Sequence, residues 1–323
     1  MVEEVVVALS RPIWVIGGGG IAYSTDNAVT WTRIATTRLG GLTGVNSVAY
    51  DGIGRWVAVG TGSIIAYSTN NTASWIGVPN GPDRGGITEG LSVAYGNGRW
   101  VVVGYGSRIA YSTNGTSWTA ATNVGGITIG RSVAYGNGRW IVVGNGSSIA
   151  ISTNGIDWNG VGGDSSTPNS PDDRGGIING RGVAYGNGRW VVVGNGSLIA
   201  YSTTNGDSWT RVVSGISRGG IYLGETVAYG NGRWVIAGDD DFVTAPYFSI
   251  AYSTNGTTWT AVTPDSNLGG LGYVYGSGYG NGKWVTVGTF SAIATSINGT
   301  SWAAVPAANR GGFSSGRTVV YAP

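Results

Sequence analysis

Short apolar runs alternate with Gly- and Asn-rich turns along the chain, and Ser92–Gly130 shows the pattern in its clearest copy. There, two apolar runs, SVAY and RWVVVG, are joined by Gly96–Gly98. Asn-Gly between alternating apolar residues is the strongest short-range signal for a β-hairpin. Turns at Tyr105–Ser107 and Asn114–Gly115 then set off two further runs, RIAYST and SWTAA. The segment therefore predicts a meander of four antiparallel strands.

Two tryptophans recur in step with this meander. The spacing within each series runs from 40 to 51 residues, the size of one four-stranded propeller blade. The first series comprises Trp14, Trp56, Trp100, Trp140, Trp190, Trp234 and Trp284. The second comprises Trp31, Trp75, Trp118, Trp158, Trp209, Trp259 and Trp302, so that all 14 tryptophans belong to the repeat. We therefore expect an all-β, seven-bladed β-propeller, with residues 1–323 forming one domain of seven repeats.

Each end of the chain carries a copy of the first strand of the repeat, Val7–Leu9 and Val319–Tyr321. The C-terminal copy follows an ordinary linker, RGGFSSGR. Next to the N-terminal copy, Ser10–Pro12 replaces the usual Gly-Asn-Gly turn. We expect Thr318–Tyr321 to complete blade one and close the ring, with Met1–Leu9 peripheral. Closure of this kind removes exposed sheet edges, which otherwise invite aggregation.

Composition narrows the range of functions. The chain has no Cys and no His, which excludes disulfides, thiol-bound metals and catalysis by imidazole or thiol. A formal net charge of +2 is too small to predict binding to nucleic acid or to an acidic membrane. No stretch approaches the roughly 18 apolar residues of a membrane span, and acids stand where a signal peptide needs basic residues. We expect no cofactor, nucleic acid or membrane insertion; oligomeric state and compartment stay open.

A recurring motif separates the third and fourth predicted strands of the blades. It reads YSTDNAVTW over Tyr23–Trp31 and YSTNGTSW over Tyr111–Trp118. These strings resemble the Asp-box of BNR-repeat propellers, Ser-x-Asp-x-Gly-x-Thr-Trp, with Asp26 in place and Ala28 where Gly is expected. The preceding Val-Gly-x-Gly-Ser-x-Ile-Ala-Tyr-Ser is similar to propellers of the photosystem II assembly-factor type and to those encoded by large viruses and phages. The resemblance covers essentially the whole chain and implies the fold. We interpret the box itself as a hairpin staple.

Sialidases also carry Asp-boxes, and their chemistry needs an arginine cluster, a Tyr nucleophile with a Glu partner and an acid/base carboxyl group. The early Arg-Ile-Pro motif of that family is missing, because Arg11–Ile13 reads Arg-Pro-Ile. The glutamates are Glu3, Glu4, Glu89 and Glu225, and none lies in a repeat-breaking Tyr/Glu constellation. We therefore expect no enzymatic activity and rank a sialidase-like glycosidase last.

A basic residue precedes the first-series tryptophan in six blades. These residues are Arg55, Arg99, Arg139, Arg189, Arg233 and Lys283. On a propeller, this first hairpin and the Asp-box turn share one face. The basic series either binds anionic partners, or stacks over neighbouring aromatic rings and donates to turn carbonyls. We favour the second interpretation.

The opposite face, formed by the linkers and the second hairpins, is where the blades differ most and where specificity is expected. The candidate ligand-binding residues there are Arg84, Arg131, Arg174, Arg181, Arg218, Arg310, Arg317, Asp239, Asp240, Asp241 and Tyr247. The three aspartates stand in an insertion of blade six beside aromatic residues. A calcium site, a sugar-binding surface and a solvated acidic loop are the alternatives, and we favour the solvated loop over the metal site.

These features favour a non-catalytic binding or structural propeller that recognises a glycan or a surface receptor. Near-identical blades suit this class because equivalent weak sites give avidity. The resemblance to virus-encoded propellers implies a virion-surface or attachment role. The alternative is a scaffold or assembly factor that docks a protein partner, as the resemblance to photosystem II assembly factors implies. Several equivalent sites would indicate a lectin, and one asymmetric patch would indicate a scaffold.

Overall fold

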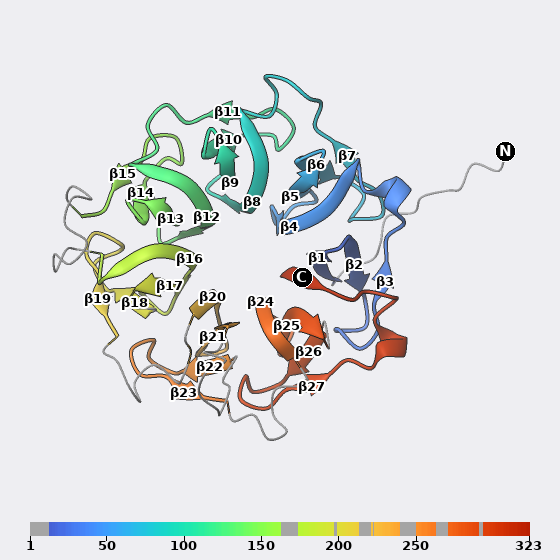
Figure 1. The fold of residues 1–323 in the computed structure, drawn as a ribbon. Coiled ribbons are helices and arrows are strands. Elements are labelled where there is room, and N and C mark those ends of the chain that lie inside the picture. Colours follow the sequence, from blue (N-terminus) through green and yellow to red (C-terminus); the bar gives the residue numbers. More distant parts are fainter. Residues whose placement is uncertain are drawn as a thin grey trace.

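The computed structural model describes residues 13–162, 174–196, 199–212, 221, 223–239, 250–262, 271–290 and 293–323. The described elements are β-strands and two short 3-10 helices, η1 (Thr36–Arg38) and η2 (Ala307–Asn309). The strands form seven four-stranded antiparallel sheets, arranged as blades around a central axis (Figure 1). The expected seven-bladed propeller is therefore confirmed.

In each blade the inner strand lies next to the axis and three strands follow outward (Figure 1). Blade one consists of β28 (Gly316–Ala322), β1 (Ile13–Gly18), β2 (Ile21–Ser24) and β3 (Thr32–Arg33). Blade two consists of β4 (Leu42–Tyr50), β5 (Trp56–Gly62), β6 (Ile65–Ser68) and β7 (Ile76–Gly77). Blade three consists of β8 (Ile87–Gly96), β9 (Arg99–Gly106), β10 (Ile109–Ser112) and β11 (Thr119–Ala120). Blade four consists of β12 (Ile127–Gly136), β13 (Arg139–Gly146), β14 (Ile149–Ser152) and β15 (Asn159–Gly160).

The remaining blades repeat the same order. Blade five consists of β16 (Ile177–Gly186), β17 (Arg189–Gly196), β18 (Ile199–Ser202) and β19 (Thr210–Arg211). Blade six consists of β20 (Leu223–Gly230), β21 (Arg233–Asp239), β22 (Ile250–Ser253) and β23 (Thr260–Ala261). Blade seven consists of β24 (Leu271–Gly280), β25 (Lys283–Phe290), β26 (Ile293–Ser296) and β27 (Ala303–Ala304).

The C-terminal strand closes the ring. β28 is the innermost strand of blade one and pairs antiparallel with β1, with Val320 opposite Val15. The expectation that Thr318–Tyr321 completes blade one is confirmed. Met1–Leu9, expected to be peripheral, lies outside the described residues.

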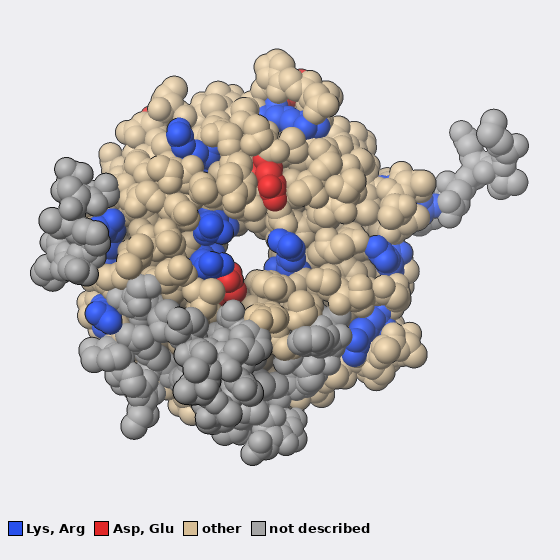
Figure 2. Space-filling view, in the orientation of Figure 1, with Lys and Arg blue, Asp and Glu red and all other residues tan. Residues whose placement is uncertain are grey.

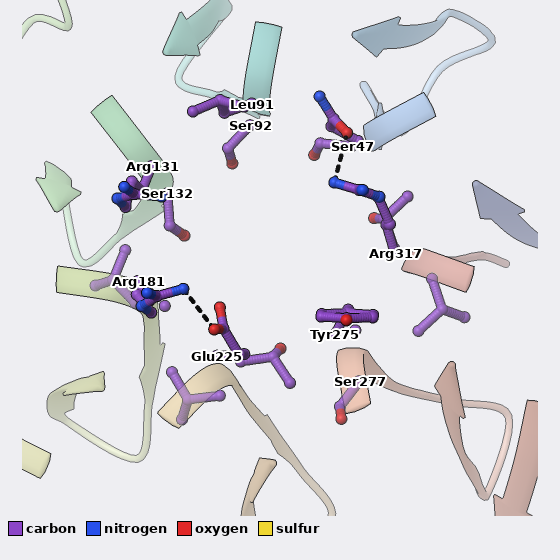
Figure 3. A pocket seen from close by; sticks show the side chains of 18 residues that line it. Ser47, Leu91, Ser92, Arg131, Ser132, Arg181, Glu225, Tyr275, Ser277 and Arg317 are labelled. Carbon is purple, nitrogen blue, oxygen red and sulfur yellow. Dashed lines mark hydrogen bonds and ion pairs between the residues drawn. The ribbon is translucent and has the colours of Figure 1, made fainter. Parts of the chain in front are cut away.

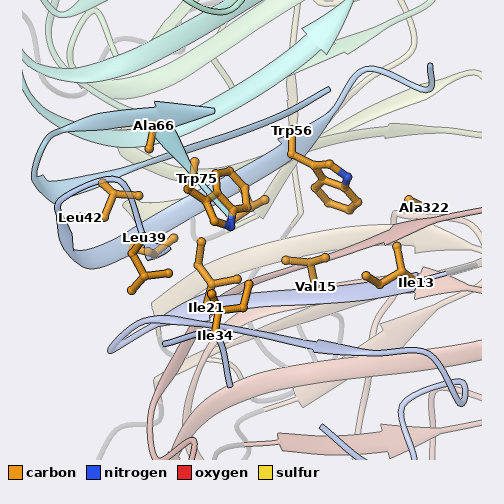
Figure 4. Packing of buried hydrophobic residues seen from close by; sticks show 13 residues of the cluster. Ile13, Val15, Ile21, Ile34, Leu39, Leu42, Trp56, Ala66, Trp75 and Ala322 are labelled. Atoms are coloured by element: carbon orange, nitrogen blue, oxygen red, sulfur yellow. The ribbon is translucent and has the colours of Figure 1, made fainter. Parts of the chain in front are cut away.

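The core lies between neighbouring blades, as the two-residue period of a strand requires. Ile13 and Val15 of β1 pack toward blade two, in a cluster with Trp56 (Figure 4). Trp14 of the same strand packs toward blade seven, in a cluster with Val285. All first-series tryptophans are at most 1% exposed. Each blade thus contributes both of its faces to the interior, which explains the nearly continuous apolar runs in β5, β9 and their equivalents.

The first hairpins depend on glycine for both their turn and their packing. In blade three, Asn97 and Gly98 have φ of 47° and 71°, as a two-residue turn with both central residues at positive φ requires. Gly96 lies beneath the ring of Tyr135 in blade four, where a Cβ would come within 2.2 Å of the ring. The same glycine–tyrosine contact recurs at four further blade junctions, Gly136–Tyr185, Gly186–Tyr229, Gly230–Tyr279 and Gly280–Tyr321.

Candidate functional site

Every inner strand contains a β-bulge at the same position. In β8, Gly90 pairs with Gly104 and Ser92 with Val103, so that Leu91 between them has no partner in the ladder. A bulge re-aims the side chain of its unpaired residue, and bulges are common next to binding sites. The unpaired residues of the seven blades are Asn46, Leu91, Arg131, Arg181, Glu225, Tyr275 and Arg317. We call these seven residues the channel-mouth ring.

Glycine packing explains why the bulge forms at this point. The residue before the bulge is Gly90 in blade three, and a Cβ there would lie 2.5 Å from Cβ of Val59 in blade two. Across the sheet, a Cβ on Gly104 would lie 2.0 Å from the carbonyl oxygen of Glu89. Backbones therefore approach here more closely than any side chain allows. The extra residue is turned out of the ladder toward the axis.

The channel-mouth ring surrounds a cavity on the propeller axis that is divided into two parts, of about 160 and 170 Å³, and all seven ring residues line both parts. Figure 3 shows the labelled side chains arranged around this space, and all of them come from the seven inner strands. In the space-filling view, the molecule is hollow at its centre and charged side chains border the opening (Figure 2). Each part is smaller than the 300–1,000 Å³ of ordinary small-molecule sites, so its size fits one side chain or chain end of a larger partner.

Hydrogen bonds hold most of the polar ring residues in place (Figure 3). Arg181 Nη1 donates to Glu225 Oε1 at 2.5 Å, in an ion pair that is about one quarter exposed. Arg317 Nη1 donates to Asn46 Oδ1 at 3.2 Å, and Asn46 Nδ2 donates to the Gly90 carbonyl at 2.9 Å. These bonds cross between blades, so they fix the shape of the mouth and also link neighbouring inner strands.

The charges of the channel-mouth ring do not balance. It holds three arginines and one glutamate, and that glutamate is paired with Arg181. Arg131 Nε donates to the amide oxygen of Asn145 at 2.9 Å, and Arg317 bonds to an amide as described above. Among the described residues, no carboxylate pairs with Arg131 or Arg317. A further acid, Glu89, accepts a 3.4 Å hydrogen bond from Asn46 Nδ2. The mouth therefore offers two guanidinium groups to an anionic group.

Three of the arginines singled out by the sequence, Arg131, Arg181 and Arg317, come together in this ring. Arg84, Arg174 and Arg310 lie instead at the outer parts of the blades and donate to main-chain carbonyls. Arg84 donates to Val78 O at 3.0 and 3.2 Å, Arg174 to Ser147 O at 3.4 Å, and Arg310 to Val305 O at 2.6 Å. Arg84 and Arg174 are only 8% and 9% exposed, and burial lowers the pKa of Arg84. These contacts give them a structural role.

The blade-six candidates fall mostly outside the described residues. Asp239 ends β21, opposite Leu223. Arg218, Asp240, Asp241 and Tyr247 are not among the residues that the structure describes.

Four ring members were missed by sequence reasoning: Asn46, Leu91, Glu225 and Tyr275. A signal for them exists. When the inner strands are aligned on their Val-Ala-Tyr core, one position follows Gly or Val and precedes Ser, Thr or Gly, as in Gly-Leu-Ser, Gly-Arg-Ser and Gly-Glu-Thr. That position holds five different residue types in seven blades, although the residues on either side of it vary little. Such variation between nearly constant neighbours indicates a position that differs in function and not in packing.

The basic series on the opposite face has the structural role that the sequence favoured. Arg189 stacks over Tyr201 of its own blade at 4.9 Å and donates to the Asn255 carbonyl of the next blade's Asp-box. Arg233 stacks over Tyr252 at 5.0 Å and reaches the Asn298 carbonyl in the same way. Lys283 Nζ donates to Asn27 O at 2.8 Å. We use the term inter-blade clasp for the hydrogen bond from each of these basic side chains to the Asp-box of the following blade.

The described residues contain no cluster of three or more Asp or Glu side chains able to hold a metal ion. None of their helices has the length and apolarity needed to cross a membrane.

Comparison with known proteins identifies the architecture and no more. No family model and no curated protein matches the chain. Among solved structures, it is similar to one described as "YCF48 bound to D1 peptide", with a TM-score of 0.55 and 14% sequence identity. The match covers 93% of this chain and 87% of that chain. At this identity the similarity shows a shared propeller fold, which extends over nearly the whole of both chains.

Proposed function

We propose that this chain is a non-catalytic docking propeller that holds a carboxylate-bearing segment of a protein partner at the channel-mouth ring. The observation that supports it is the ring itself: seven equivalent bulged positions that point to one cavity yet differ in side chain. Seven equivalent sugar pockets would instead repeat the same lining residues. The proposal therefore follows the scaffold alternative in preference to the multivalent glycan receptor and the virion-surface role.

The dimensions and charge of the mouth favour this ligand. Each part of the cavity, of about 160 or 170 Å³, accepts a single side chain or chain end, and Arg131 and Arg317 offer donors in the forked geometry that matches a carboxylate. Tyr275 is 38% exposed and stands 6.5 Å from Tyr273 in a stacked arrangement, which supplies an aromatic surface beside the cations. The similar propeller was solved with a bound peptide, and this agrees with a peptide ligand here.

A non-catalytic role is supported by the shortage of carboxylates. Glycoside hydrolysis canonically uses two carboxyl groups that flank the bond to be broken. The channel-mouth ring has one, Glu225, and it is engaged with Arg181. A paired carboxylate beside three arginines is suited to fixing a binding surface.

The test is a peptide array in which octamers carry acidic side chains at varied positions, each with a free or an amidated C-terminus. We expect binding that requires at least one carboxylate and that weakens about tenfold or more in Arg131→Gln and Arg317→Gln, since a charge-assisted hydrogen bond contributes roughly 1.5–3 kcal/mol. Arg99→Gln, on the opposite face, is the matched control and should bind normally. Equal binding by all three variants, or no dependence on carboxylates, would overturn the proposal.

A further inference from the structure

A second cavity, of about 420 Å³, lies between blades two and three at the other end of the inner strands. Tyr95, which lines it, follows Leu91 of the channel-mouth ring by four residues on β8. At roughly 3.3 Å per residue this places the two sites about 13 Å apart along the strand. The volume falls within the range of small-molecule sites.

An irregular hairpin accounts for this cavity. In blade two, Asp51–Gly54 stands where five other blades have Gly-Asn-Gly, so the turn is one residue longer. At those five turns the first glycine lies beneath the tyrosine of the following blade. Here Asp51 takes its place next to Tyr95, and both residues line the cavity. The side chain at this position prevents the close contact that seals the other junctions.

The side chain of Asp51 stabilises the loop that replaces the turn. Asp51 Oδ1 accepts hydrogen bonds from the amides of Ile53, Gly54 and Arg55, each at 2.9 Å. Its second carboxylate oxygen has no hydrogen bond to a described residue. The loop also displays Ile53, which is 85% exposed although it is apolar.

The inter-blade clasp is also absent at this junction. Arg139, Arg189, Arg233 and Lys283 each bond to the Asp-box of the following blade. The guanidinium of Arg55, the equivalent residue of blade two, stacks over Tyr67 at 5.7 Å and makes no hydrogen bond to a described residue, which is also true of Arg99 in blade three. The Arg55 guanidinium lines the cavity with its donors available.

The lining selects a neutral ligand that carries hydroxyl groups. The charges of Asp51 and Arg55 cancel, so neither an anion nor a cation is favoured, in contrast to the channel-mouth ring. Thr69, Thr113 and Asn114 add short polar groups that both donate and accept. Ile53 and the ring of Tyr95 provide an apolar wall. Adjacent hydroxyls together with an apolar face of C–H groups are the chemistry of a sugar ring.

We propose that the cavity between blades two and three binds one neutral saccharide unit, either free or at the end of a glycan. Hydroxyl groups of the sugar donate to the free oxygen of Asp51 and accept from Arg55, while Ile53 covers its apolar face. Within the part of the chain that the structure describes, the site occurs once, and it is independent of the channel-mouth ring.

Saturation-transfer NMR on the full chain with glucose, galactose, mannose and N-acetylglucosamine, each at millimolar concentration, tests the proposal. We expect transfer to at least one of them. The key variant replaces Asp51–Gly54 with Gly-Asn-Gly, the turn that five blades already use, so the fold is expected to tolerate it. Its affinity for the sugar should fall about tenfold or more, as should that of Asp51→Asn. Arg131→Gln is the matched control and should bind the sugar normally.

Two results would overturn the proposal: no saturation transfer to any of the four sugars, or unchanged binding in the turn replacement. A glycan array distinguishes a free sugar from the end of a glycan as the ligand. If the ligand is a glycan, a saccharide unit attached to a glycan should bind more tightly than the same sugar free in solution. The two sites are tested separately. Ring variants that lose peptide binding should keep sugar binding, and the turn replacement that loses sugar binding should keep peptide binding, so the pattern shows which of the two sites has failed.

Discussion

At the scale of single residues, the guanidinium and indole groups of the repeat stabilise the protein to very different degrees. Trp118 is 3% exposed and fills the space between two blades, whereas Arg99 is partly exposed and stacks over Tyr111 at 5.2 Å. We expect Trp118→Ala to lower the free energy of unfolding by about 3–5 kcal/mol, as truncation of a buried aromatic does. Arg99→Ala should cost about 0.5–1 kcal/mol, the value of an exposed cation–π contact. Denaturant titration measures both, and equal losses would place Arg99 in the core.

Asp26 gives the first Asp-box a dependence on pH. Partial burial of its carboxylate raises the pKa, but hydrogen bonds from the side chain and amide of Thr30, from the Ser24 hydroxyl and from the Val29 amide outweigh this and lower it. A lowered pKa in the folded state means that the ionised form stabilises the fold at pH values above the unfolded pKa of about 3.9, and that this stabilisation is lost as pH falls through the folded pKa.

We therefore expect Asp26→Asn to be slightly less stable than the parent at neutral pH. The difference should shrink toward zero as the solution is acidified below about pH 3.9, because the parent then loses its advantage. Thermal unfolding of both proteins between neutral and strongly acidic pH measures this. A difference that stays constant over the whole range would show that the charge of Asp26 does not contribute.

At the scale of elements, the strands follow from the sequence and the bulges do not. Alternation and Asn-Gly pairs locate β8, β9 and their equivalents because both signals are local. The bulge at Leu91 depends on the contact of Gly90 with Val59 of another blade, which no local pattern encodes. For the same reason Arg131, Arg181 and Arg317 were found by their charge, whereas Asn46 and Tyr275 were not found at all. A position-by-position comparison of the repeats can identify these ring residues, which local strand propensity cannot.

The glycine–tyrosine contact between blades is an element-scale feature with a direct test. A Cβ at Gly96 would lie 2.2 Å from the ring of Tyr135, whereas a Cβ at Gly98 meets nothing within 4 Å and faces only the strain of a φ of 71°. Gly98→Ala should cost about 1 kcal/mol. Gly96→Ala should cost more, roughly 1–3 kcal/mol of overpacking or beyond. If denaturant titration finds the two variants equally stable, the blades can slide apart to admit a methyl group.

At the scale of the whole molecule, closure of the ring supports both proposed sites. The channel-mouth ring includes Arg317 of β28, the strand that closes blade one, so an open ring loses one of its two available cations and its bond to Asn46. The cavity between blades two and three lies away from that closure, since its lining comes from the turn between β4 and β5, from Thr69 after β6 and from blade three. Removal of β28 therefore affects the two sites differently.

A chain ending at Ser315 should lose cooperative unfolding or unfold at much lower temperature, because β1 becomes an unpaired edge and the buried face of Val319 is lost. Adding a synthetic peptide of Gly316–Pro323 should restore part of the stability by pairing with β1. The sequence predicts Met1–Leu9 to be peripheral, so its deletion is the control and should leave the unfolding temperature nearly unchanged. A larger loss from the N-terminal deletion than from removal of β28 would mean that the N-terminal segment, and not the C-terminal strand, secures the ring.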